Sequence, residues 1–386
     1  MIKLNSRLPN VGNTIFSTMS ALAVQHQAVN LGQGFPDFNC DAKLVDLVSQ
    51  AMQQGHNQYP PMAGVPALRQ MVALKVEQLY QRRYHPDSEI TITAGATQAI
   101  MCAIQCCVHP GDEVIVIEPA YDCYLPAIEL CGAVAVTVAM ELTDHGFQIP
   151  WSTLAEKITA KTRLIIINSP NNPTGSVLHQ SDLSALAAIL REPQNAHVLL
   201  LSDEVYEHMV YDGAMHVSVS AHEELAQRAF VISSFGKTFH VTGWKVGYVT
   251  APAALMIEFR KIHQFTVFTV NTPVQYALAA YLLDPLPYQQ LSTFYQTKRD
   301  IFRAGLAHTR FKLLSVQGTY FQCVDYRAIS DLPELAFAEW LTKDVGVAAI
   351  PVSAFYRQGL ESGLVRFCFA KQESTLELAL QKLASI

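Results

Sequence analysis

Two short runs of large aliphatic residues constrain the fold more than any other feature of this chain. The segments 163–167 and 197–201 are almost continuously apolar after their first residue, without the polar alternation of a half-exposed strand. Strands of a parallel sheet need such runs because helices cover both faces of the sheet. A helical pattern at 181–190 separates the two runs. The order strand, helix, strand predicts an α/β fold with a doubly wound, mostly parallel sheet.

Polar and aromatic residues follow the ends of the predicted strands. These strands lie at 89–93, 113–117, 163–167, 197–201 and 229–232. In open α/β sheets, ligands bind beyond the carboxyl ends of the strands. We therefore expect one ligand site at this edge, built from Thr97, Tyr121, Asn172, Asp203, Tyr206 and Lys237.

Lys237 has an unusual local setting for a lysine. It follows Gly236, stands among hydroxyl residues and has aromatic residues on both sides. Desolvation of such a lysine lowers its pKa and leaves a neutral amine that can react with a carbonyl. The sequence Gly236-Lys237-Thr238 also matches the end of a nucleotide phosphate loop, but that motif requires glycine where Val231 stands. A surface or structural lysine is the alternative when Lys237 is considered alone.

A second feature of the expected site is the turn at 94–97. It follows a predicted strand, consists of small residues and leads into a helix from Gln98. The free backbone N–H groups at a helix N-terminus, together with the helix dipole, favour a phosphate.

The loop 30–38 contains two glycines and a proline among aromatic residues. A dinucleotide-binding fingerprint would need a third glycine at Asp37, so this interpretation fails. An ordinary turn and a loop whose glycine backbone approaches a ligand, through Gly34, remain the two interpretations.

Composition and charge exclude several classes of protein. The net charge is −6 and no basic run occurs, which argues against nonspecific nucleic-acid binding. No apolar stretch reaches the 18 or so residues of a membrane span, and residues 1–16 do not resemble a signal peptide. The eight cysteines lack the paired spacing of a metal site, so we expect free thiols, no bound metal and a reduced, cytoplasmic protein.

The domain organisation follows from the helix-breaking segment Asp284-Pro285-Leu286-Pro287. We predict a large domain at 46–284 that holds the parallel sheet. We expect residues 1–45 to join residues 285–386 in a smaller α+β domain.

The chemistry of the expected site matches the needs of pyridoxal phosphate. This cofactor requires an amine for its aldehyde, a helix N-terminus for its phosphate and an acid for its ring nitrogen. Lys237 offers the amine and Asp203 the acid, while Tyr206 and Asn172 can bond to the phenolic oxygen. Considered singly, Asp203 is also a good helix N-cap.

Three motifs at their observed separations resemble those of a known family. They are Asn172-Pro173-Thr174-Gly175, the segment 202–206 and Ser234-Phe235-Gly236-Lys237. Over nearly its whole length the chain resembles the class I, fold-type-I aminotransferases that depend on pyridoxal phosphate. Within them it is most similar to the bacterial methionine aminotransferases, close to the kynurenine–glutamine transaminase branch. The resemblance implies a homodimer with shared active sites.

The resemblance also implies a role for each site residue. Lys237 condenses with the cofactor aldehyde and carries the proton between substrate and cofactor. Arg366 binds the substrate carboxylate, a task that suits a guanidinium fork. The implied cofactor contacts are Ala96, Thr97, Ser234 and Lys245 at the phosphate, Tyr121 against the ring, Asn172 and Tyr206 at the phenolic oxygen, Asp203 at the ring nitrogen, and Tyr59 from the partner subunit. The implied substrate contacts are Gly34, Asn172, Arg366, Phe16, Phe355 and, from the partner, Phe268.

Two departures from the wider family affect the phosphate site. Ala94 replaces a common hydroxyl residue, and Lys245 stands where some relatives have arginine, which gives a point charge in place of a fork.

The expected activity is transfer of an amino group, by a ping-pong cycle, from methionine or a similar neutral or aromatic amino acid to a 2-oxo acid. The pocket candidates Phe16, Phe35, Tyr59, Phe268 and Phe355 are apolar or amphipathic, and no second arginine matches a dicarboxylate substrate. The alternatives on the same fold are a carbon–sulfur β-lyase and a kynurenine or glutamine transaminase. A cofactor-binding transcriptional regulator would need a further, basic domain.

Overall fold

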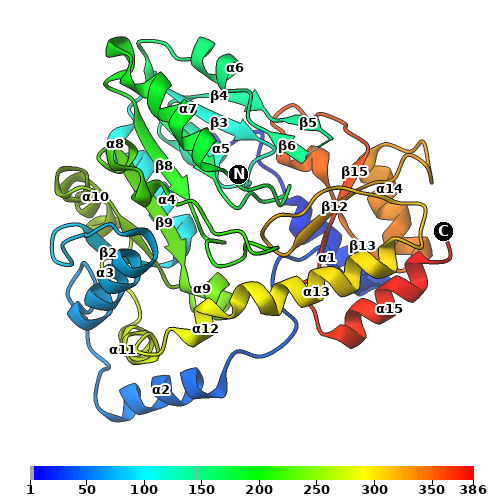
Figure 1. Cartoon of the computed structure of the whole chain (residues 1–386), viewed down its shortest axis with the longest axis horizontal. Coiled ribbons are helices and arrows are strands. Elements are labelled where there is room, and N and C mark those ends of the chain that lie inside the picture. The colour runs from blue at the N-terminus through cyan, green and yellow to red at the C-terminus, as the bar shows by residue number, and fades with distance from the viewer. Residues whose placement is uncertain (1–3, 145) are drawn as a thin grey trace.

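The computed structural model describes residues 4–144 and 146–386. Its centre is a seven-stranded sheet, which Figure 1 shows between layers of helices. The strands lie side by side in the order β2-β10-β9-β8-β7-β3-β4. Five of them, from β9 to β4, pair in parallel, whereas β10 is antiparallel to both of its neighbours. The bounds are β2 (Ile90–Thr93), β10 (Gly247–Thr250), β9 (Ala229–Ser234), β8 (Leu199–Asp203), β7 (Thr162–Asn168), β3 (Glu113–Glu118) and β4 (Val134–Ala139).

Helices cover both faces of this sheet, as the apolar runs predict. Because side chains alternate along a strand, Ile166 packs on one face while Ile165 and Ile167 pack on the other. The first face is covered by α4 (Gly95–Cys107), α5 (Tyr124–Leu130) and α10 (Ala253–Thr266). The second is covered by α6 (Trp151–Glu156), α7 (Gln180–Arg191) and α8 (Glu223–Ala226). The helices α3 (Pro66–Tyr80) and α11 (Thr272–Tyr281) pack at the β2–β10 edge, where α2 (Ala42–Gln53) lies against α11.

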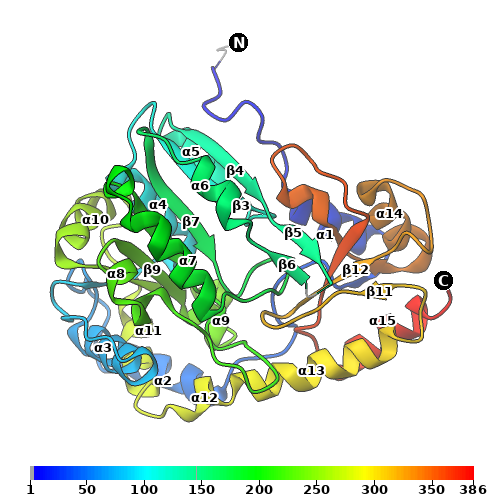
Figure 2. The ribbon, with the colours of Figure 1, turned by 45° about the horizontal axis from the view of Figure 1, so that its top comes forward.

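A second sheet of four strands lies apart from the first (Figure 2). Its order is β11 (Lys312–Leu313), β12 (Phe321–Asp325), β15 (Leu364–Cys368) and β14 (Ile350–Pro351). Helices α13 (Leu291–Leu306), α14 (Glu334–Trp340) and α15 (Glu373–Leu383) pack around it. The short elements are β5 (Glu141–Thr143), β6 (Gly146–Gln148), α9 (Phe235–Thr238) and α12 (Leu286–Gln289).

The N-terminal segment joins this second part of the chain. Helix α1 (Ile15–Gln25) packs beside it, and β1 (Val29–Asn30) pairs with β13 (Val347–Ala348) in parallel, with Val29 opposite Val347. These contacts support the proposed small domain of residues 1–45 and 285–386, of which residues 1–3 lie outside the described chain. The boundaries of both domains remain predictions.

The predicted strands agree with the structure apart from their ends, but the start of one helix and one whole strand differ from the prediction. The α4 helix begins at Gly95, three residues before the expected start, because Gly95 adopts a positive φ of 78° that turns the chain directly from β2 into the helix. The segment 286–306 forms two helices, α12 and α13, which meet at Gln290. The β10 strand was not predicted.

A buried ion pair fixes the end of β8 beside the neighbouring strands. Lys75 on α3 donates to Oε1 of Glu207 at 2.7 Å, and both side chains are less than 5% exposed. Tyr248 on β10 and Ser233 on β9 also donate to this oxygen, and Tyr80 donates to the other at 2.5 Å. Burial raises the pKa of Glu207, but the Lys75 charge and these donors outweigh it and hold that pKa well below its usual range. The carboxylate therefore ties α3, β9 and β10 to the segment after β8.

Candidate active site

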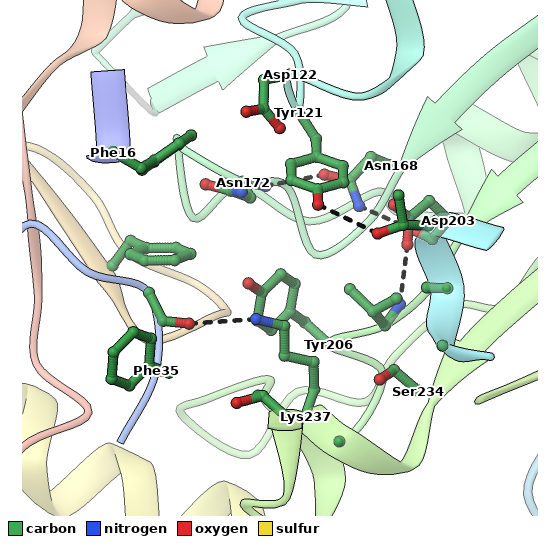
Figure 3. Close-up of a pocket in the computed structure, with 18 of the residues that line it drawn as sticks. Phe16, Phe35, Tyr121, Asp122, Asn168, Asn172, Asp203, Tyr206, Ser234 and Lys237 are labelled. Atoms are coloured by element: carbon green, nitrogen blue, oxygen red, sulfur yellow. Dashed lines mark hydrogen bonds between the residues drawn. The ribbon is translucent and has the colours of Figure 1, made fainter. Parts of the chain in front are cut away.

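The carboxyl end of the parallel strands opens into a cavity of about 280 Å³. Figure 3 shows side chains from distant parts of the sequence facing this space. Thirteen of the residues predicted for the site line it, namely Phe16, Gly34, Phe35, Ala96, Thr97, Tyr121, Asn172, Asp203, Tyr206, Ser234, Lys237, Lys245 and Arg366. The common position of strand ends at one sheet edge explains most of this convergence.

Lys237 reaches the cavity from the short helix α9, directly after β9. Its amine donates to the carbonyl oxygen of Gly34 at 3.2 Å and to the hydroxyl of Tyr320 at 3.0 Å. Burial lowers the pKa of Lys237 to about 8, and the Asp203 charge acts in the opposite direction. A substantial fraction of this amine is thus neutral near pH 8, as nucleophilic or basic chemistry requires.

Asp203 is the last residue of β8 and is 3% exposed. Tyr124 on α5 donates to Oδ2 at 2.6 Å, and the backbone N–H of Val205 donates to Oδ1 at 3.3 Å. Burial raises the pKa of Asp203 to about 6, although these two hydrogen bonds oppose the shift. No cation is bonded to this carboxylate among the described residues, so the site holds an acid suited to a positively charged ligand group.

Arg366 on β15 is 1% exposed. One terminal nitrogen donates to Oδ1 of Asn172 at 2.7 Å, and the other donates to the Gly32 carbonyl at 2.8 Å. Its Nε finds no partner among the residues that the structure describes. The guanidinium carbon lies 3.9 Å from the centre of the Phe321 ring. A buried guanidinium with spare donors is suited to binding a carboxylate.

The N-terminus of α4 offers groups that suit an anion. Ala96 and Thr97 stand in its first turn, and no side chain caps the helix. Lys245 lies close by, since a β-carbon on Gly95 would be 3.4 Å from Nζ of Lys245. Ser234, at the end of β9, lines the same part of the cavity. The free N–H groups, the helix dipole and the ammonium all favour negative charge there.

Two phenols complete the wall of the cavity. Tyr121 hydrogen-bonds through its hydroxyl to Thr97 at 3.3 Å. Tyr206, three residues after Asp203, is buried, with its ring edge-on to Tyr320 at a centroid distance of 5.2 Å. Burial raises the pKa of both phenols, so each keeps its proton and can donate a hydrogen bond at neutral pH.

Comparison with known proteins agrees with this geometry. Residues 26–383 match the family model of class I and II aminotransferases. The chain belongs to this family. It is therefore a transaminase.

Its relatives cover nearly the whole chain. The methionine aminotransferase of Escherichia coli is 47% identical over 99% of this chain and 98% of its own length. A probable N-succinyldiaminopimelate aminotransferase of Mycobacterium tuberculosis is 38% identical over 98% and 97% of the two chains. Kynurenine–oxoglutarate transaminase 1 of the mouse is 34% identical over 98% and 96%. A solved Escherichia coli structure, described as having a methionine aminotransferase function, superposes with a TM-score of 0.96 at 46% identity and covers 100% of both chains.

Three residues predicted for the transaminase site lie outside the cavity of this single chain. Tyr59 is 79% exposed and Phe268 is 40% exposed, with their rings edge-on 5.2 Å apart. Phe355 is buried behind the cavity wall, where its ring lies 5.8 Å from Phe16 and 5.1 Å from the guanidinium carbon of Arg366.

Several site residues were not predicted. Asn168 carried a usable signal, since it ends β7 as Asp203 ends β8. Tyr124 begins α5, and its bond to Asp203 joins residues 79 positions apart, which no local pattern records. Tyr320 and Phe321 had no comparable signal, because they precede and begin a short strand of the second sheet. Besides Asn168 and Phe321, the lining residues that were not individually predicted are Gln33, Gly95, Asp122, Val205, Gly236, Thr242 and Val246.

The lowered pKa of Lys237 predicts selective reactivity. In the chain without added ligand, reductive methylation of Lys237 should reach half of its maximal rate near pH 8, against about 10.4 for an ordinary lysine. Asp203→Asn should move this midpoint to lower pH, because it removes a charge that favours the ammonium form. Asp46→Asn, which removes an exposed carboxylate on α2, is the matched control. Peptide mapping by mass spectrometry measures the rates, and a Lys237 midpoint near the ordinary value would contradict the assignment.

Proposed function

We propose that this transaminase uses pyridoxal phosphate to move the amino group of methionine, or of a similar neutral or aromatic L-amino acid, to a 2-oxo acid. The observation that carries the proposal is one cavity lined by a lysine with a lowered pKa, a buried carboxylate and a buried guanidinium with a free donor. The names of the relatives support the same reaction class and include methionine as a donor.

The groups around the cavity fit the cofactor. Asp203 is a buried carboxylate without a bonded cation among the described residues, which suits a protonated ring nitrogen. The start of α4 with Lys245 suits the phosphate. The proposed cofactor contacts are Ala96, Thr97, Ser234 and Lys245 for the phosphate, Tyr121 for the ring face, Asn172 and Tyr206 for the phenolic oxygen, Asp203 for the ring nitrogen and Lys237 for the aldehyde.

When bound, pyridoxal phosphate supplies an electron sink for the charge that remains after the substrate loses its α-proton. The neutral amine of Lys237 removes this proton and later returns one. Asp203 holds positive charge on the ring nitrogen, and the Tyr124 hydrogen bond keeps its Oδ2 in place. Removal of the α-proton therefore depends on a neutral Lys237 and an ionised Asp203, which their pKa values of about 8 and about 6 allow together in weakly alkaline solution.

Arg366 binds the substrate α-carboxylate, with Asn172 and Gly34 beside it. In the structure its two terminal nitrogens bond to Asn172 and Gly32, which orients the guanidinium before substrate arrives. A donor that is already fixed in a buried site loses little conformational freedom on binding. The same contact serves every α-amino acid, so it does not choose among their side chains.

The remaining wall of the cavity favours an uncharged side chain. Phe16, Phe35 and Phe321 line it, and Phe355 packs behind them against Phe16. The side-chain carboxylate of aspartate or glutamate would be buried there without a second arginine, at a large desolvation cost. Kynurenine and glutamine remain alternative donors, as does carbon–sulfur β-elimination on the same residues.

We further propose a cytoplasmic homodimer in which Tyr59 and Phe268 serve the active site of the partner subunit. The exposure of both aromatic side chains, which pack against each other on one surface, supports this arrangement. None of the described helices has the length and apolar character needed to span a membrane.

A donor screen tests the proposed reaction. With methionine, phenylalanine, glutamine, kynurenine and aspartate as donors, kcat/KM should be highest for methionine and on the order of 100-fold lower for aspartate. Oxo-acid formation measures transfer, and release of pyruvate with a thiol from a cysteine conjugate measures β-elimination. Lys237→Ala is the inactive control. Preference for aspartate, or elimination faster than transfer, would contradict the proposal.

Mixed dimers test the shared site. Lys237→Ala and Tyr59→Ala should each be nearly inactive yet folded. In a mixed dimer, one site carries both defects and the other carries neither, because each patch of an isologous interface contacts its own copy. Activity should return towards one working site per mixed dimer, measured after subunit exchange and separation by two affinity tags. Inactive mixed dimers would rule out Tyr59 as a residue of the neighbouring site.

A further inference from the structure

We propose that Tyr320 is a positioning residue for Lys237, and that its hydroxyl and the Gly34 carbonyl occupy both N–H bonds of the neutral amine and so direct the nitrogen lone pair into the cavity. The inference rests on the proposed function, since it concerns how Lys237 acts there. Three contacts carry it. Tyr320 donates to the Gly34 carbonyl at 2.6 Å, and Lys237 donates to the Tyr320 hydroxyl at 3.0 Å and to the same carbonyl at 3.2 Å.

The direction of these hydrogen bonds determines what Tyr320 can do. Its single hydroxyl proton is committed to Gly34, so towards Lys237 the phenol oxygen can only accept. The Gly34 carbonyl also only accepts. A neutral amine has two N–H donors and one lone pair, and these two acceptors use both donors. The amine of Lys237, the hydroxyl of Tyr320 and the carbonyl of Gly34 thus form a hydrogen-bonded triangle. Within this triangle the lone pair of the amine has no partner, so it is free to take a proton or to attack a carbonyl.

Packing holds the phenol in this position. Tyr320 is 1% exposed, and its ring contacts the rings of Tyr206, Tyr295 and Phe321 at centroid distances between 4.9 and 5.5 Å. Its backbone carbonyl accepts from the N–H of Phe369 at 2.9 Å. Burial raises the pKa of Tyr320 far above its usual range, so the hydroxyl keeps its proton throughout the working pH range. Tyr320 is thus a fixed acceptor, and Lys237 remains the base.

The position of Gly34 depends on the same strand. A β-carbon at Gly34 would lie 2.9 Å from Cζ of Phe321, which leaves no room for a side chain. The backbone of the loop therefore packs directly on β12, one residue after Tyr320. The two acceptors for the amine are thus the hydroxyl of Tyr320, directly before β12 of the second sheet, and the carbonyl of Gly34 in the N-terminal loop. Lys237, in contrast, follows β9 of the first sheet. The triangle joins the two halves of the molecule at the reacting nitrogen.

The variant Tyr320→Phe removes the hydroxyl and keeps the ring. Tyr326→Phe is the matched control, because Tyr326 follows the same strand and donates to the Leu332 carbonyl at 2.7 Å, outside the cavity. Two readouts separate positioning from stability. One is the rate at which the chain freed of cofactor reacts with pyridoxal phosphate from pH 6 to 10, followed by visible absorbance. The other is the division of any steady-state loss between kcat and KM.

In Tyr320→Phe the plateau rate of this condensation, and kcat, should fall about 10- to 100-fold, since a misdirected reacting atom is costly. KM for methionine should change less than about twofold, because Arg366 is untouched. The midpoint of the pH profile should move below the wild-type value of about 8, because the lost acceptor had favoured the ammonium form. The control should match the wild type in plateau, midpoint and kcat.

Three results would overturn the inference. A Tyr320→Phe variant with the wild-type plateau and midpoint shows that the hydroxyl does not position the amine. A lowered melting temperature with an unchanged pH profile assigns Tyr320 to stability alone, and the melting temperature of Tyr326→Phe gives the ordinary cost of one such hydrogen bond. If the wild-type chain does not condense with pyridoxal phosphate, the proposed function itself fails, and this inference fails with it.

Discussion

The buried ion pair between Lys75 and Glu207 is the interaction on which the site geometry depends. Glu207 lies one residue after Tyr206, and it bonds to Ser233, the neighbour of Ser234. One carboxylate on the side away from the cavity thus holds the segments that present Tyr206, Ser234 and Lys237 to the cavity. Removing one partner of a buried pair typically costs about 3–5 kcal/mol, because the other charge stays buried. The contact is therefore a constraint on the shape of the site as well as a source of stability.

The cavity itself gains its chemistry from burial. The same desolvation that lowers the pKa of Lys237 to about 8 raises the pKa of Asp203 to about 6. Burial thus moves a base and an acid towards neutral pH from opposite sides, and the opposite charges limit both shifts. Arg366 stays cationic but is held by Asn172 and Gly32 with a donor free. Each of these groups is suited to a ligand group of opposite charge. Because all three line one cavity, they can contact the same bound ligand.

Much of the fold could be predicted because its signals are local. The apolar runs at 163–167 and 197–201 indicate strands that are buried on both faces. The β7 strand contains the first run, and β8 contains most of the second. The β10 strand shows no such apolar run, because it consists of only the four residues that follow Val246. It pairs antiparallel with both of its neighbours, and this pairing depends on where those strands lie. The order of the strands depends on packing between distant segments, which no local pattern records.

The site likewise contains residues that local sequence patterns could place and residues that depend on contacts between distant segments. Residues at strand ends, such as Asp203 and Lys237, could be placed by the rule for ligand sites in α/β sheets. Arg366 came only from the family resemblance, because its position in the second sheet gives no sign that it is buried. Tyr320 could not be found at all, since its role arises from a hydroxyl that meets Lys237 across 83 residues of sequence. The contacts between the two sheets, and the size of the pKa shifts that burial causes, depend on how distant segments pack together. Local sequence patterns therefore do not reveal them.

The central claim is that Lys237 is the residue to which pyridoxal phosphate attaches. Borohydride reduction of the purified holoenzyme, followed by peptide mass spectrometry, tests this claim most directly. We expect a phosphopyridoxyl group on the peptide that contains Lys237, with one group per chain and none in Lys237→Ala. A stable modification at another lysine, or unmodified Lys237 in an active enzyme, would contradict it.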